Sequence, residues 1–258
     1  MSELVVRYRP LGWLIARETV RVYKLWLQTI AAPVISSFLF ILVFGLSLGE
    51  RVRPIEGFAY DVYIVPGLIT MAMVQSAFSN TSTSLMQARL DRYIHDVLAA
   101  PMRPWEINLG VCIGGMLRAL TIGVSLLALS LLLVDVPLAE PLVLLAALAL
   151  LLVMFTTLGV VVGVYAETFD HHQFVNNIML LPLTFLGGVF YSVSTLPSAW
   201  EAVSHANPIF YLVQAVRYGF LGSGDVSPLL SLSVIAALTA GSVAWSSYLF
   251  ATGHRLKA

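Results

Sequence analysis

Six long runs of apolar residues, separated by short polar stretches, make up most of the chain. They cover residues 30–48, 62–83, 107–134, 142–165, 174–191 and 229–251. About 20 residues of helix cross a bilayer core, so each run is long enough to span a membrane. Because lipid offers the backbone no hydrogen-bond partner, the runs are predicted to be helices. The pattern predicts one all-α integral membrane domain over residues 1–258, with six transmembrane helices.

A shorter apolar segment, residues 209–222, lies between the fifth and sixth runs. It would form about 21 Å of helix, which is less than the roughly 30 Å of a bilayer core. Asn207 can cap this helix, and Pro208 suits its first position. Another short apolar piece, residues 196–203, precedes it. These features favour a re-entrant helical hairpin within residues 192–227, and the alternative is an amphipathic loop lying on the membrane.

Charge predicts the orientation of the helices. Only 11% of the residues are charged and the net charge is zero, so the chain has neither the surface of a soluble domain nor a basic excess for nucleic acid. If both termini are cytoplasmic, ten Lys and Arg residues lie inside, in residues 1–29, the loop 84–105 and the tail. Three lie outside, namely Arg51, Arg53 and Arg217. The positive-inside rule therefore predicts that both termini are cytoplasmic.

The first cytoplasmic segment, residues 1–29, has the period of an amphipathic helix. Arg17, Arg21 and Lys24 share one face. The opposite face carries Leu11, Ile15, Val22 and Trp26. Such a helix lies in the headgroup layer with its cations toward water and anionic lipid. A membrane-surface anchor and an interface helix that also touches a partner protein both fit this pattern.

The second cytoplasmic segment, within residues 84–105, reads "QARLDRYIHDVLAAPMRP". It predicts a short helix, ended by Pro101, in which Arg92 and Asp96 are spaced to form an ion pair. A helix of mixed charge on this side of the membrane suits docking into a groove of another protein. A solvated connector is the alternative.

The sequence holds no motif of a catalytic or metal site. There is no GxxxxGK[ST] phosphate loop, no HExxH and no GxSxG, and the five histidines are scattered. The single cysteine excludes an internal disulfide. No catalytic residue and no metal ligand is therefore predicted.

Arg118 is the one charge deep within an apolar run. A cation at that depth is a functional candidate unless it snorkels or pairs with an acid such as Glu167 or Asp170. Two GxxxG spacings, Gly110 to Gly114 and Gly159 to Gly163, predict close helix approach.

Two stretches resemble a known family. "RYIHDVLAAPMRPWEINLG" resembles the coupling region of ABC-2 type exporter permeases, although His95-Asp96 stands where the family branch more often has two acids. "ETFDHHQFVNNIMLLPLTFLGGVFYSVSTLPSAWEAVSHANPIFYLVQAVRYGFLG" resembles their C-terminal signature. The resemblance covers nearly the whole chain and is closest to the YadH- and NodJ-like branch.

The resemblance implies a fold like that of type V ABC exporters, working as a homodimer on two copies of a separate ATP-binding subunit. ATP and Mg would be held by that subunit, and this chain would bind no cofactor. The implied coupling-helix residues are Arg89, Arg92, Tyr93, His95 and Asp96. The implied interface-helix residues are Arg17, Arg21 and Lys24. The implied extracellular gate comprises Gly187, Gly188, Asn207, Pro208, Tyr211 and Arg217, with Arg217 expected to snorkel to the outer surface.

The expected function is that of the permease subunit of an ATP-driven exporter in the bacterial cytoplasmic (inner) membrane. The family's cargoes include drugs, lipids, glycolipids and polysaccharide, and spans rich in Leu, Val, Ala and Ile favour an amphipathic, lipid-like cargo. Arg118 or Arg217 is hypothesised to help an anionic headgroup pass. The alternatives are an ion-coupled secondary transporter and an intramembrane enzyme. A secondary transporter would typically have buried acids and internal repeats.

Overall fold

The long apolar runs form long helices. A computed structural model describes residues 2–48 and 53–256, and over these residues it is all-helical apart from a single β-bridge between Ile55 and Phe58. Within these residues, five helical segments are long and apolar enough to cross a membrane. They are Leu27–Gly45, from η1 (Leu27–Ala31) and α2 (Ala32–Leu48), and α3 (Tyr60–Leu90), α5 (Pro104–Ser130), α6 (Pro141–Tyr165) and α11 (Pro228–Thr252). The prediction of an all-α integral membrane protein is confirmed.

The fifth predicted run differs from the others, because it is divided. Its helical part consists of α7 (Phe169–Phe174), the π-helical η2 (Val175–Leu180) and α8 (Leu181–Leu186). It starts and ends earlier than the predicted 174–191. The chain turns at Gly188, whose φ of 78° lies in the left-handed region that glycine adopts without strain.

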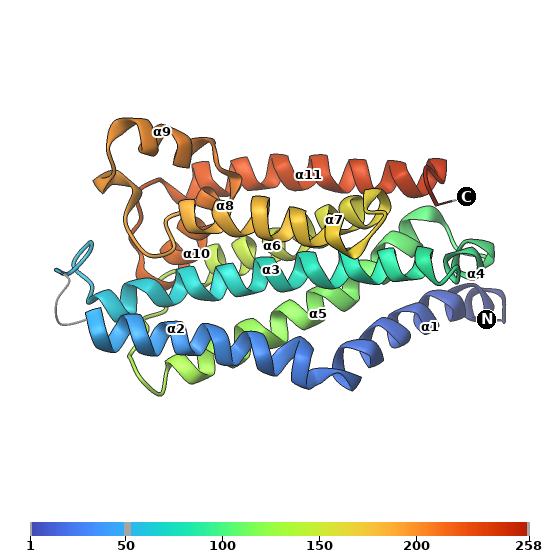
Figure 1. Cartoon of the computed structure of the whole chain (residues 1–258), viewed down its shortest axis with the longest axis horizontal. Helices are drawn as coiled ribbons and strands as arrows, with labels where there is room; N and C mark the ends of the chain where they lie inside the picture. The colour runs from blue at the N-terminus through green and yellow to red at the C-terminus, as the bar shows by residue number, and fades with distance from the viewer. Residues whose placement is uncertain (1, 49–52, 257–258) are drawn as a thin grey trace.

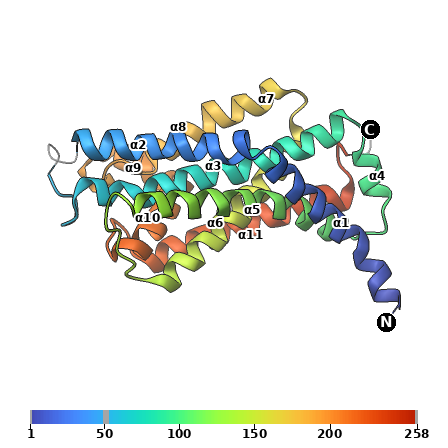
Figure 2. The same ribbon diagram turned by 90° about the horizontal axis from the view of Figure 1, so that it is seen from below.

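The helices lie side by side along one long axis, with α3 at the centre (Figure 1). α3 packs most extensively against α6 and α5, and α11 packs on α6. α1 (Ser2–Lys24) leads into η1 and crosses the start of α5 (Figure 2). α1, α4 (Ile94–Ala99) and the end of the described chain share one end of the molecule. The 3-10 turn η3 (Val193–Thr195), α9 (Ser198–Ala206) and α10 (Pro208–Leu221) lie at the opposite end.

Glycines set the closest helix contacts. A Cβ added at Gly159 would lie 2.6 Å from the carbonyl oxygen of Phe78, and one at Gly163 would lie 2.8 Å from that of Ser82, both on α3. The other GxxxG pair, Gly110 and Gly114, packs instead against Leu14 and Glu18 of α1. The prediction that these spacings bring helices close is confirmed, with a different partner helix for each.

The buried apolar side chains form two clusters. The larger joins α3, α5, α6 and α10, and the smaller lies under α4 and contains Ile94, Leu85, Val160 and Leu249. Of the cations used for the orientation, Arg51 and Lys257 lie outside the described residues, as do the side chains of Arg7 and Arg9.

Candidate functional site

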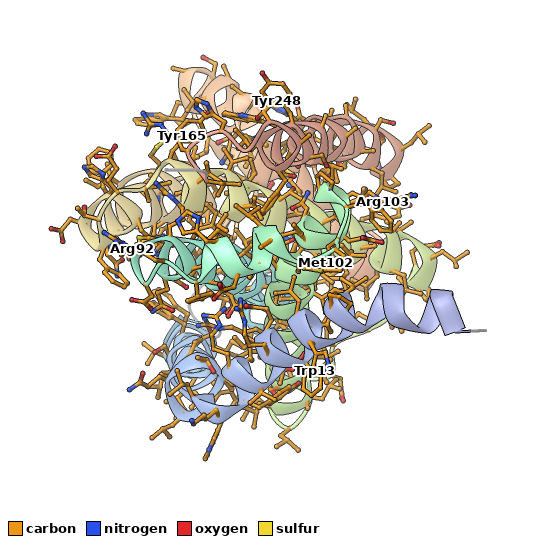
Figure 3. All side chains as sticks on the ribbon, turned by 90° about the vertical axis from the view of Figure 1, so that its right-hand side faces the viewer. Trp13, Arg92, Met102, Arg103, Tyr165 and Tyr248 are labelled. Atoms are coloured by element: carbon orange, nitrogen blue, oxygen red, sulfur yellow. The ribbon has the colours of Figure 1, made fainter. Side chains whose placement is uncertain are left out.

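The connection between α3 and α5 carries the residues predicted to contact a partner protein. α4 is only six residues long and is attached through Ile94, which is 3% exposed. His95 and Asp96 point away from this contact and are exposed. Figure 3 looks onto this end of the molecule, where Arg92 and Trp13 are labelled. A short helix with a buried anchor and an exposed polar side therefore stands at the end of the bundle.

The short helix of this segment begins only at Ile94. α3 ends at Leu90, and Arg92 lies in the turn before α4 with a φ of 62°. The left-handed backbone at Arg92 breaks the helical phase. The predicted ion pair between Arg92 and Asp96 is consequently wrong: these residues are not on one helix, and no ion pair joins them in the described structure.

α1 is fixed to this end by a cation and a buried acid. The guanidinium of Arg17 lies 4.6 Å from the centre of the Tyr93 ring, which joins α1 to the start of α4. Burial raises the pKa of the Tyr93 phenol, so the ring is uncharged at neutral pH. Arg17 thus contacts both the α4 turn and its neighbour Glu18, at 2.8 Å.

Glu18 is the functional candidate that the sequence did not reveal. It is fully buried, and it accepts hydrogen bonds from Ser84 of α3 at 2.7 Å and from Arg21 at 3.1 Å. Arg21 in turn donates to the backbone and side-chain oxygens of Asn80, both at 3.2 Å. Of the predicted interface cations, Arg17 and Arg21 are therefore bound to protein, and Lys24 is exposed. The buried stripe of α1 is Leu14, Glu18 and Val22, whereas Trp26, predicted for the apolar face, is 58% exposed.

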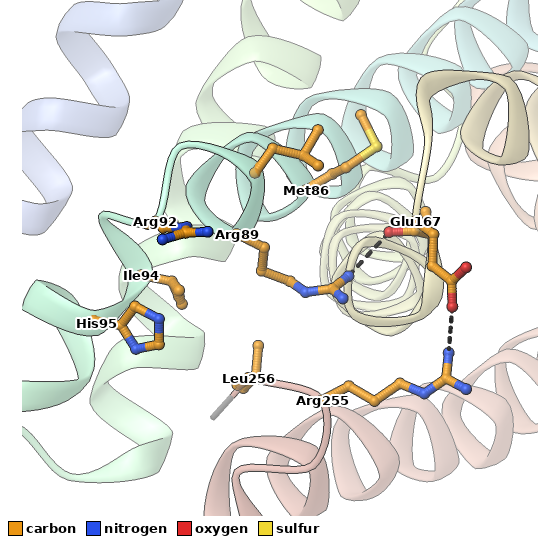
Figure 4. A pocket seen from close by; sticks show the side chains of 10 residues that line it. Met86, Arg89, Arg92, Ile94, His95, Glu167, Arg255 and Leu256 are labelled. Atoms are coloured by element: carbon orange, nitrogen blue, oxygen red, sulfur yellow. Dashed lines mark hydrogen bonds and ion pairs between the residues drawn. The ribbon is translucent and has the colours of Figure 1, made fainter. Parts of the chain in front are cut away.

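A charged cavity of about 520 Å³ opens beside α4 (Figure 4). Arg89 points into it and donates to the carbonyl oxygens of Ala166 at 2.9 Å and Gly163 at 3.1 Å, at the end of α6. Glu167 and Arg255 form an ion pair of 3.5 Å across it. His95 forms part of the opposite wall. More cations than acids therefore line the cavity on one side of α4.

The opposite end brings together most of the residues predicted for the outer gate. The side-chain oxygen of Asn207 accepts from the backbone N–H of Ile209 at 3.0 Å, and Pro208 occupies the first turn of α10. The Asn207 amide also donates to the carbonyl oxygen of Leu183 at 2.6 Å. Gly187 packs against Ile209. The predicted cap and short helix are confirmed, while Tyr211 packs against the larger apolar cluster and lies edge-on to the ring of Phe210.

Arg217 does not snorkel. Its side chain is fully buried, donates to the carbonyl oxygen of Gly188 at 2.7 Å and lies 4.0 Å from the centre of the Tyr63 ring. The prediction failed because the sequence does not show that the turn after α8 presents two carbonyl oxygens to this guanidinium. Asp225 was not predicted from the sequence. It accepts hydrogen bonds from the Ser192 hydroxyl, from the N–H of Val193 and from Gln214. These bonds connect the loop after α10 to the turn after α8.

Arg118 has no acidic partner among the described residues. Its Nε donates to the carbonyl oxygen of Thr29 at 2.8 Å. The pair with Glu167 that sequence reasoning allowed is wrong, because Glu167 pairs with Arg255. The described residues contain no group of three His, Cys, Asp or Glu side chains that could hold a metal ion. Buried His172 instead faces the Ser82 hydroxyl at 3.0 Å.

Comparison with known proteins agrees with this arrangement. The profile of the ABC-2 type transporter family matches residues 9–221. The chain belongs to the ABC-2 type transporter family. This ABC-2 permease is 39% identical over 220 residues to the inner membrane transport permease YadH of Escherichia coli (strain K12), a match that covers 85% of this chain and 86% of YadH.

More distant relatives of this ABC-2 permease are nodulation J proteins. The protein of Sinorhizobium fredii (strain NBRC 101917 / NGR234) is 25% identical over 216 residues, which cover 82% of this chain and 81% of that protein. The protein of Rhizobium meliloti (strain 1021) is 23% identical over 217 residues, which cover 82% and 83%. The resemblance found in the sequence is confirmed, and the comparisons support a membrane transport permease.

Proposed function

We propose that this ABC-2 permease is the membrane subunit of an ATP-driven exporter. Two copies would assemble with two copies of a separate ABC ATP-binding subunit, which holds ATP and Mg. Both termini face the cytoplasm, and α7, η2 and α8 complete a set of six transmembrane segments. The location is the inner membrane of a bacterium, as the printed name of the Escherichia coli relative supports.

The observation that carries this proposal is α4. It is a short helix anchored by one buried residue, its polar side chains are exposed, and a cavity rich in cations adjoins it. It follows directly on α3, which runs through the centre of the bundle. A partner seated on α4 would therefore move the central helix. α1, joined to α4 through Arg17 and Tyr93, acts as the interface helix.

The opposite end acts as the outer gate. α10 has 14 residues, about 21 Å of helix, and cannot cross a bilayer core. It is fixed by Asn207 at its start and by Arg217 near its end. α9 and α10 would close the outer side of a path for an amphipathic cargo.

The experiment is co-purification with the ATP-binding subunit encoded beside this chain, followed by ATP hydrolysis in lipid nanodiscs. The test variant reverses both charges of the α4 segment, Arg92→Glu with Asp96→Arg. The matched control is Asp170→Arg, which reverses an exposed charge on α7 at the same end of the molecule. We expect a stable complex in which only the α4 variant loses most of the hydrolysis stimulated by the permease.

Two results would overturn the proposal. One is failure of the wild-type chain to hold any ATP-binding subunit. The other is a complex whose hydrolysis responds equally to the α4 variant and to the control. Either result would favour transport driven by an ion gradient, which liposomes with an imposed proton gradient would then reveal.

A further inference from the structure

A second cavity, of about 370 Å³, lies beside the middle of α5 at membrane depth. α2, α3, η2 and α5 all contribute to its wall. Its polar lining includes Ser36, Ser37, Gln75, Ser79, Asn176 and Arg118. No Asp or Glu lines it. Apolar side chains, among them Leu68 and Met71, complete the wall. The cavity is therefore partly polar, and it carries a positive charge with no counter-ion in the described part of the chain.

Arg118 is held so that part of its guanidinium is free. The Nε is bound to the carbonyl oxygen of Thr29, and the two terminal nitrogens make no hydrogen bond to the described residues. A cation in a transmembrane helix faces protein, water or a substrate pathway, because lipid cannot solvate it. The planar terminal nitrogens of arginine suit an anionic oxygen group, which they can bind in pairs.

Two further observations point to a ligand in the same place. The Nε2 of Gln75 is buried without a hydrogen-bond partner, although it is a strong donor. Both π-helical segments also reach the cavity, η1 through Gln28 and η2 through Asn176. Single π-helical turns occur frequently at functional sites. The cavity thus combines a free cation, an unused donor and two local departures from α-helical geometry.

An apolar groove adjoins the cavity. Ser36 and Phe40 of α2 belong to both, and the groove of about 320 Å³ is otherwise lined by Leu39, Val43 and Phe44. Leu39 and Val43 are more than half exposed on the outer side of the helix. A partly polar, cationic chamber beside an apolar groove matches a molecule with an anionic head and a hydrocarbon tail.

We propose that this cavity binds the anionic, hydroxyl-bearing headgroup of one lipid-like molecule, with its acyl chain along α2. Arg118 binds the anionic group, and Gln75 donates to an oxygen of the headgroup. Identifying that lipid as the cargo class rests on the proposed exporter function. The binding itself does not, because it requires only this chain.

The test measures binding to the permease purified in a neutral detergent without any ATP-binding subunit. Dioctanoylphosphatidylglycerol is the anionic probe, dioctanoylphosphatidylcholine is the zwitterionic control, and glycerol 3-phosphate supplies a soluble phosphate without a tail. Native mass spectrometry gives the bound fraction and the Kd of each probe. We expect the anionic lipid to bind best and glycerol 3-phosphate not to displace it.

The variants separate the groups involved. Arg118→Gln should raise the Kd of the anionic lipid by about tenfold or more, as expected for the loss of a charge-assisted hydrogen bond. Gln75→Leu leaves the bond between Arg118 and Thr29 intact and should raise the Kd of the anionic lipid roughly 2- to 10-fold. Arg53→Gln removes an exposed cation from the loop before α3 and should change nothing.

Three results would overturn the inference. The first is equal binding of the two lipids, or binding unaffected by both Arg118→Gln and Gln75→Leu. The second is displacement of the lipid by glycerol 3-phosphate, which would indicate a soluble anion. The third is loss of the oligomeric state of Arg118→Gln in light scattering, which would indicate that a second copy fills the cavity. Lipid binding without any ATPase coupling would instead retain the site and reject the exporter.

Discussion

Replacing Gly159 by alanine tests whether α3 and α6 depend on a contact that admits no side chain. The added Cβ would lie 2.6 Å from the Phe78 carbonyl oxygen, 3.1 Å from the Cβ of Thr81 and 3.2 Å from the N of Ser82. Two of these three atoms belong to the backbone of α3. They cannot rotate away as the end of a flexible side chain can, so the two helices must separate.

The expected cost follows from two opposing effects. Overpacking a well-packed interior lowers the free energy of unfolding by about 1–3 kcal/mol. Alanine in place of glycine within a helix raises it by about 1 kcal/mol. Gly241 of α11 isolates the second effect, because a Cβ there would meet nothing within 4 Å. The variants Gly159→Ala and Gly241→Ala should therefore differ by about 1–3 kcal/mol, or roughly 2–12 °C in Tm for a chain of this size.

The chain contains its own reporter for this measurement. Cys112 is the only cysteine and is 3% exposed, packed within α5. A fluorogenic maleimide added during a temperature ramp reacts with it when the bundle opens, so both variants are read at the same site. Equal Tm values for Gly159→Ala and Gly241→Ala would show that α3 and α6 separate at no cost, and the close-contact reasoning would then be wrong.

Two further predictions use the same Cys112 assay. Glu18→Gln keeps an acceptor for Ser84 but loses the charge facing Arg17 and Arg21, so the free energy of unfolding should fall by about 1–2 kcal/mol. Lys24→Gln, at an exposed site on the same helix, should leave Tm unchanged. An equal change in Tm for the two variants would show that the contacts of Glu18 with Ser84 and Arg21 do not stabilise the fold. Asn207→Ala removes the cap of α10 and the bond to Leu183, so it should cost about 1–2 kcal/mol. Asn207→Ser keeps a cap oxygen without the donor to Leu183 and should recover part of the loss; no recovery would mean that the cap contributes nothing.

Features that depend on nearby residues in the sequence were predictable. Hydropathy placed the long helices, because each backbone segment in lipid must satisfy its own hydrogen bonds. Asn207 and Pro208 predicted the start of α10 because capping involves residues only two positions apart. The GxxxG spacings predicted close approach, although not which helix would approach.

Features that depend on distant partners were not predictable. In the sequence, Glu18 belongs to a polar helix face. Only the fold brings it to Ser84, 66 residues later, which donates a hydrogen bond to it. In the sequence, Arg217 is a cation near the predicted outer surface. Only the fold brings its guanidinium to within 2.7 Å of the carbonyl oxygen of Gly188. Arg92 has a left-handed backbone. Arginine rarely adopts this conformation, so the residue type gave no indication of it. In each case the missing information was a tertiary contact or a backbone angle.

The contacts along α3 connect the two cavities through one helix. Ser79 lines the membrane-depth cavity, and the next residue, Asn80, is bound by Arg21 of α1. The same helix ends at Leu90, about 16 Å farther along, just before α4. On the other side of the cavity, two side-chain hydrogen bonds join α3 to the divided fifth segment: Ser79 with Asn176 of η2 at 3.4 Å, and Ser82 with His172 of α7 at 3.0 Å. If a partner displaces α4, α1 and α3 are therefore tied to move together, and the longer of the two hydrogen bonds, between Ser79 and Asn176, is the one expected to open at the cavity.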